Sequence, residues 1–111
     1  MIHKRFEFGK EHYPLMSSAW ESLSVNHNGL GRTRVISGRE RQTIEGNVGV
    51  DADNASYSFD LYPKKKKGEV FITAEFESGI EAVVTGFRNV LGVDIERFDS
   101  RYAARGELQT A

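Results

Sequence analysis

The sequence predicts an α+β fold with two layers, in which a mainly antiparallel sheet of three to five strands carries two helices on one face. Three observations lead to this prediction. Residues 69–77 alternate between two faces as a half-buried strand does, with Val70, Ile72 and Ala74 on the apolar one. Residues 80–91 then place apolar side chains at intervals of three and four, as an amphipathic helix does. Several further alternating segments in the middle of the chain are typical of an antiparallel meander.

The helix predicted over residues 80–91 has both a start signal and a stop signal. Ser78 and Glu81 have the S-x-x-E spacing of a capping box. Gly92 stands where a residue in the left-handed conformation commonly ends a helix. The competing prediction is a strand over residues 80–87, because the β-branched residues in this segment favour extended chain.

The other elements are predicted from turn-forming residues that separate alternating or helical segments. Strands are expected over residues 2–8, 32–37, 42–50 and 56–62, a helix from Pro14 to the turn formers at 26–29, and turns at 51–54 and 63–68. Residues 93–98 are compatible with a last strand or with a short helix, and residues 103–111 are expected to be a frayed tail. The core is expected to include Phe76, Phe87 and Leu91.

The length and composition are those of an ordinary globular domain. With 111 residues, 39% of them hydrophobic and 28% charged, the chain is expected to form one domain over residues 1–111. The formal net charge is -1, and the lack of cysteine excludes disulfides and thiolate metal sites. No apolar run has the length of a membrane span or the position of a signal peptide core, so we expect no membrane partner and a cytoplasmic location.

No group of residues has the spacing of a catalytic or metal site. The three histidines, His3, His12 and His27, lack the i, i+4 partners that bind metal ions on a helix. Gly29 and Gly31 form only a fragment of a phosphate loop, and the serines have no nucleophile-elbow context. We therefore expect a protein that is not an enzyme, with no catalytic residue, no metal site and no cofactor.

Two basic segments provide the candidate binding residues. The candidates are Arg32, Arg34, Arg39, Arg41, Lys64, Lys65, Lys66 and Lys67. If the two segments lie side by side, they form a patch that suits phosphates, because neutralising phosphates releases counterions. Alternatively, the lysines belong to a solvated hairpin turn, where they keep the chain soluble and prevent edge pairing.

Two classes of function follow from these observations. The first is a small binding protein that recognises or inhibits another macromolecule, as accessory and immunity proteins of phages and mobile elements do. A protein partner is favoured, because acidic residues such as Asp53, Glu75 and Glu77 repel a nucleic acid if they lie close to the lysines. The alternative is a nucleic-acid-binding accessory domain that uses both basic segments. A third class is a small-molecule-binding or weakly enzymatic domain with its pocket between helix and sheet. No oligomeric state is predicted.

Overall fold

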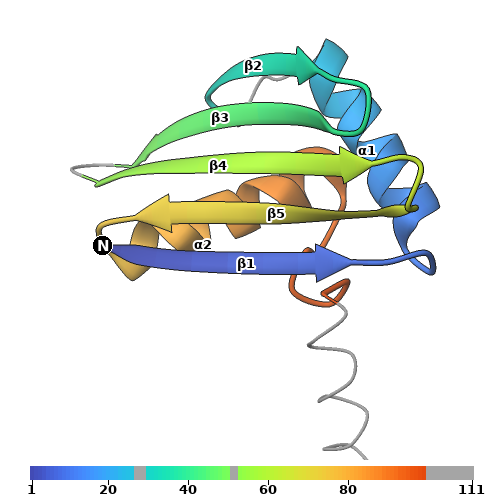
Figure 1. The fold of residues 1–111 in the computed structure, drawn as a ribbon. Helices are drawn as coiled ribbons and strands as arrows, with labels where there is room; N and C mark the ends of the chain where they lie inside the picture. Colours follow the sequence, from blue (N-terminus) through green and yellow to red (C-terminus); the bar gives the residue numbers. More distant parts are fainter. Residues whose placement is uncertain (27–29, 51–52, 100–111) are drawn as a thin grey trace, which may run out of the picture.

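The computed structural model describes residues 1–26, 30–50 and 53–99, and these form one five-stranded sheet with two helices (Figure 1). The elements are β1 (Ile2–Phe8), α1 (Tyr13–Val25), β2 (Arg32–Ser37), β3 (Gln42–Val50), β4 (Asp53–Tyr62), β5 (Lys67–Ala74), α2 (Glu77–Gly86) and the π-helical turn η1 (Phe87–Leu91). The strand order is β1-β5-β4-β3-β2, and every neighbouring pair is antiparallel. The predicted α+β fold with an antiparallel sheet is confirmed.

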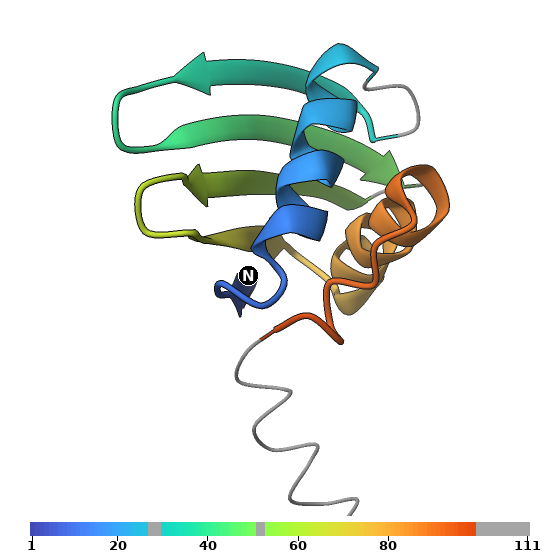
Figure 2. The ribbon, with the colours of Figure 1, turned by 90° about the vertical axis from the view of Figure 1, so that its right-hand side faces the viewer.

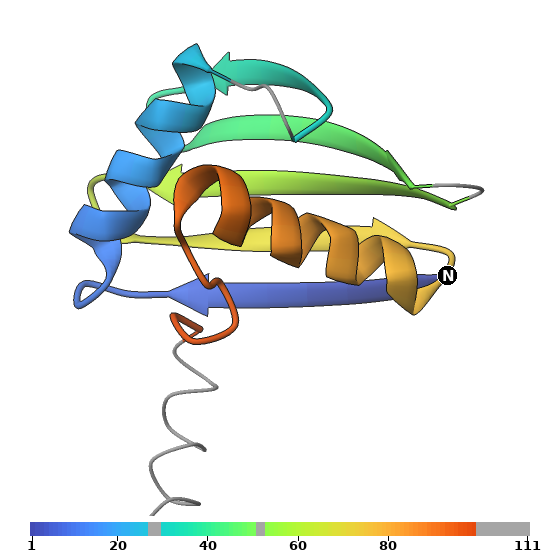
Figure 3. The same cartoon turned by 180° about the vertical axis from the view of Figure 1, so that it is seen from behind.

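Both helices lie on the same side of the sheet, which Figures 2 and 3 show from two directions. The buried side of α1 includes Met16, Trp20 and Leu23, and that of α2 includes Ile80 and Val83. These side chains pack against the helix-facing residues of the strands in a single core. The opposite face of the sheet, which we call the outer face, carries neither helix (Figure 1).

Strand β4 occupies the centre of the sheet and supplies the centre of the core. Its residues Ala55, Tyr57, Phe59 and Leu61 alternate toward the helices and are all buried. The rings of Tyr57 and Phe59 each lie 5.4 Å from the ring of Phe87. Trp20 Nε1 of α1 donates a hydrogen bond of 2.9 Å to the Phe59 carbonyl oxygen, so one strand residue contacts both helical segments.

The helix predicted after β5 is present, but it begins and caps differently from the prediction. Its first residue is Glu77 and its N-cap is Phe76, which is 58% exposed, so the prediction that Phe76 belongs to the core was wrong. Strand β5 already ends at Ala74, and the chain leaves the sheet before Phe76 can point inward. The capping box does not form, because Ser78 Oγ donates to Asp53 Oδ2 of β4 at 3.3 Å instead.

The end of the helical segment agrees with the sequence. Phe87 is fully buried, Leu91 is partly buried against the core, and Gly92 has the left-handed φ of 69° that ends the helix. The strand proposed as a competitor over residues 80–87 is excluded, because these residues are helical.

Three smaller predictions need correction or fall outside the structure. Asp53 and Asn54 belong to β4 and not to a turn, while residues 51–52 lie outside the described part of the chain. Residues 93–98 form neither a last strand nor a helix: a turn closes where the Arg97 and Phe98 amides donate to the Asp94 carbonyl oxygen. The tail predicted to fray, 103–111, also lies outside the described residues.

The two phenylalanines at either end of α2 give the first prediction. We expect Phe87→Ala to lower the free energy of unfolding by about 3–5 kcal/mol, because it leaves a cavity between the helices and the sheet. We expect Phe76→Ala, the matched control, to change it by less than about 0.5 kcal/mol. Urea unfolding of both variants checks this, and equal losses would show that the core is assigned incorrectly.

Candidate functional site

Three turns come together at one end of the sheet. At this end β3 begins with Gln42, which is opposite Leu61 near the end of β4, so the β2–β3 and β4–β5 turns lie next to each other. The β1–α1 loop lies at the same end, because it follows Phe8, which is opposite Gly68 near the start of β5. Since adjacent strands are about 4.8 Å apart, the centres of the first two turns are about 10 Å apart. Figure 2 shows these two turns one above the other along the same edge of the sheet.

This end of the molecule carries a concentration of positive charge, and we call it the basic end. Its exposed cationic residues are Lys10, Arg39, Arg41, Lys64, Lys65, Lys66 and Lys67. Two carboxylates, those of Glu11 and Glu40, share the turns. Two more, those of Glu7 and Glu69, line a cavity with Lys65 and Lys67, so the seven cations exceed these four carboxylates by three. Within residues 1–26, 30–50 and 53–99, none of the seven cations forms an ion pair.

Two of the lysines are positioned by aromatic rings. Lys66 Nζ lies 5.2 Å from the ring centroid of Tyr13, at the start of α1, and Lys67 Nζ lies 5.8 Å from that of Tyr62. Both distances are in the range of cation–π attraction. The contact between Lys66 and Tyr13 places the lysine turn beside the first turn of α1, which contains no acidic residue.

The acidic residues that the sequence analysis placed near the lysines lie at the opposite end of the sheet. Glu75 and Glu77 follow the last residue of β5, while the lysine run lies at its start, and Asp53 begins β4 at that same far end. Eight residues of strand separate the two ends by about 23 Å. This distance is more than twice the Debye length of about 8 Å at physiological ionic strength, so the expected repulsion is largely screened.

The eight predicted binding residues therefore divide into two groups. Six of them, the four lysines with Arg39 and Arg41, meet at the basic end, and Lys10 is an additional member that the sequence analysis missed. The sequence feature that could have identified Lys10 is its position directly after the first strand, because a loop at a strand end lies beside the turns of neighbouring antiparallel strands. Arg32 and Arg34 lie apart, on the outer face of β2, where Arg34 pairs with Glu45 at 2.9 Å.

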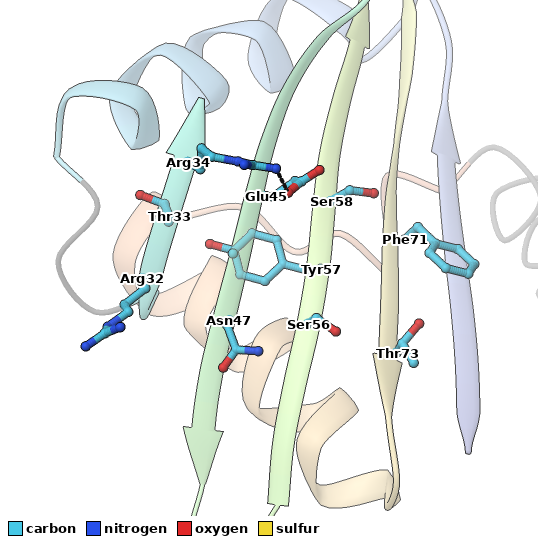
Figure 4. A pocket seen from close by; sticks show the side chains of 11 residues that line it. Arg32, Thr33, Arg34, Glu45, Asn47, Ser56, Tyr57, Ser58, Phe71 and Thr73 are labelled. Carbon is cyan, nitrogen blue, oxygen red and sulfur yellow. Dashed lines mark hydrogen bonds and ion pairs between the residues drawn. The ribbon is translucent and has the colours of Figure 1, made fainter. Parts of the chain in front are cut away.

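The outer face contains a shallow cavity of about 520 Å³, which we call the trough (Figure 4). Side chains from β2, β3, β4 and β5 line it. Arg32 and Arg34 stand along one side, Ser56 and Ser58 lie toward the middle, and Phe71 stands on the other side. The sequence analysis missed this site, although Phe71 was visible as an aromatic residue on the polar side of an alternating strand.

The shape of the trough depends on Gly46. The ring of Tyr57 passes beneath this glycine on the helix side, and a Cβ at residue 46 would clash with the ring atoms. Tyr57 Oη donates a hydrogen bond of 3.1 Å to the Leu30 carbonyl oxygen, and burial raises the pKa of the Tyr57 phenol. At this point the surface of the trough is therefore formed by the backbone of Gly46, with the hydrogen-bonded ring of Tyr57 behind it.

The Phe71 side of the trough is an ordered aromatic group. The imidazole of His3 stacks on the Phe71 ring with 5.8 Å between centroids and 13° between planes. Arg5 Cζ lies 5.6 Å from the centroid of the same ring. His3 and Arg5 come from β1, so pairing of the first strand with β5 assembles this group from distant parts of the sequence.

No metal site or membrane segment is visible in the part of the chain that the structure describes. Its histidine and acidic side chains form no cluster of three that could hold a metal ion, and none of its helices is long and apolar enough to cross a membrane.

Comparison with known proteins gives no relative: no family model, no curated protein and no solved structure matches this chain. The geometry of its own residues is therefore the basis for any functional proposal.

The second prediction concerns Gly46. We expect Gly46→Ala to lower the free energy of unfolding by about 1–3 kcal/mol, because the new methyl group forces the Tyr57 ring or β3 to move. Gly49→Ala is the control, since Gly49 is exposed in the same strand and its nearest atom is the side-chain Oδ1 of Asn54 at 3.2 Å. Thermal unfolding compares the two variants, and equal stability would show that the ring does not lie beneath residue 46.

Proposed function

We propose that this chain is a non-catalytic binding protein that holds the phosphate backbone of a nucleic acid at its basic end. The observation that supports this most strongly is the meeting of seven exposed, unpaired cations from three separate turns in the described residues. Solvated cations without ion pairs are the ones that can exchange counterions for phosphates. The near-neutral charge of the whole chain does not oppose this, because Asp53, Glu75 and Glu77 lie at the far end of the sheet.

The start of α1 adds to the positive potential of the basic end. Its first helical residue is Tyr13, followed by Pro14, and no acidic side chain of the first turn compensates the partial positive charge of the helix N-terminus. Lys10 and Lys66 flank this turn. A phosphate that approaches the basic end therefore meets the N-terminus of α1 and the exposed cations from the same direction.

The sequence favoured a protein partner for one physical reason, namely repulsion of phosphates by neighbouring acids. With about 23 Å of strand between the lysines and the acids Asp53, Glu75 and Glu77, that reason no longer applies to these three. A partner protein with an acidic surface remains the competing ligand for the same cations. The binding test below distinguishes this protein partner from a nucleic acid.

The third prediction tests the proposal with two variants that remove the same charge from different places. Arg39→Gln with Arg41→Gln removes two cations from the basic end, and Lys4→Gln with Arg88→Gln removes two from the groove between β1 and α2. Electrophoretic mobility shift and fluorescence anisotropy measure binding of mixed-sequence single-stranded and duplex oligonucleotides over a series of salt concentrations.

The basic-end variant should bind every sequence more weakly. The slope of log K against log salt concentration should become shallower by about one to two, since each lost phosphate contact removes about 0.7–0.9 from the slope. The groove variant should bind like the wild type. Equal weakening by both variants would contradict a localised site. Failure of the wild type to bind any oligonucleotide at moderate salt would favour the acidic protein partner.

A further inference from the structure

The outer face joins the basic end without any intervening helix, and this continuity points to the form of nucleic acid that fits. Tyr62 and Lys67 are opposite one another where β4 ends and β5 begins, and Phe71 and Thr73 of the trough lie further along β5. The seven residues from Lys67 to Thr73 span about 20 Å. A flexible polymer held at the lysine turn can therefore extend directly over the trough (Figures 1 and 4).

We propose that the trough is a binding site for single-stranded nucleic acid, which continues over the outer face from the basic end. This inference rests on the proposed function and specifies its ligand as a strand with unpaired bases. An open strand presents both its bases and its phosphates to such a face. A duplex keeps its bases stacked inside and has only phosphates to offer to the basic end.

The charges of the outer face permit this path. Its exposed carboxylates lie beside arginines: Glu45 pairs with Arg34 at 2.9 Å, while Glu69 and Glu7 share Arg5, at 3.6 Å and 3.9 Å. The remaining carboxylate, that of Asp60, is buried.

Two hydroxyl groups donate hydrogen bonds to that side chain. Thr43 Oγ1 donates a hydrogen bond of 2.6 Å to Asp60 Oδ1, and Ser58 Oγ donates one of 3.3 Å to Oδ2. Arg32, in contrast, has no ion pair among the described residues and lines the far side of the trough. A phosphate on this face therefore meets the unpaired guanidinium of Arg32, while the carboxylates of Glu7 and Glu69 share the positive charge of Arg5.

The aromatic group at the other side of the trough supplies the contacts that bases require. The stacked rings of His3 and Phe71 present π surface at the edge of the cavity, and Tyr62 presents another ring closer to the lysine turn. Base–aromatic stacking does not depend on sequence, because every base has a π face. Ser56 and Asn47 provide hydrogen-bonding groups between these rings and Arg32.

The test compares a labelled twelve-residue oligothymidine strand with a short hairpin duplex of the same number of nucleotides. Phe71→Leu removes the π system but keeps an apolar side chain, and Ser56→Glu adds a carboxylate at an exposed position of the trough. Phe71→Tyr restores an aromatic ring. Ser22→Glu adds the same charge at an exposed position of α1, on the other side of the sheet, and serves as the control. Thermal unfolding confirms that each variant is folded.

The wild type should bind the single strand more tightly than the duplex. Phe71→Leu and Ser56→Glu should each weaken single-strand binding by about fivefold or more and leave duplex binding unchanged, since one stacked base contributes about that factor or more. Phe71→Tyr and Ser22→Glu should bind both ligands like the wild type. If the two trough variants bind the single strand like the wild type, or lose both ligands equally, the inference is overturned. In that case the proposed function still holds if the Arg39 and Arg41 variant binds both the single strand and the duplex more weakly than the wild type does. If the wild type binds neither ligand, the proposed function itself is contradicted.

Discussion

The arrangement of this molecule depends on the contacts that Phe59 makes at the centre of the sheet. Its carbonyl oxygen accepts the indole hydrogen bond of Trp20, and its ring packs against Phe87, so it connects β4 to both helical segments. Burying these aromatic side chains supplies much of the free energy that holds the two layers together. Because both contacts are made from one side of the strand, both helices must lie on that side.

The open outer face and the basic end are consequences of this one-sided packing. A sheet that is covered on one face exposes polar residues on the other, as antiparallel sheets commonly do. The antiparallel order then places the β2–β3 and β4–β5 turns at the same end, and the acidic start of α2 at the other. Charge that is balanced over the whole sequence is therefore separated in space, which the net charge of -1 conceals.

Periodicity predicted most of the fold because the elements bury one clear face each. The period of two in β4 and β5 and the helical stripe that includes Phe87 all agree with the structure. The misassignments lie at element ends, as at Phe76 and Ser78, where the contact with Asp53 of a distant strand decides the geometry.

The candidate site was only partly predictable, for a related reason. The local basic runs were visible in the sequence, but their grouping depended on strand register. The His3–Phe71–Arg5 group required knowing that β1 pairs with β5.

The central claim is that one continuous surface, from the basic end across the outer face, binds a nucleic-acid strand. The most direct measurement is an NMR titration of the ¹⁵N-labelled protein with a single-stranded oligonucleotide, which follows the amide signals. We expect shifts in Lys10, in residues 38–41 and 64–67 and along β5 to Thr73, with little change in α2. Shifts concentrated in the groove between β1 and α2, or no shifts at all, would contradict it.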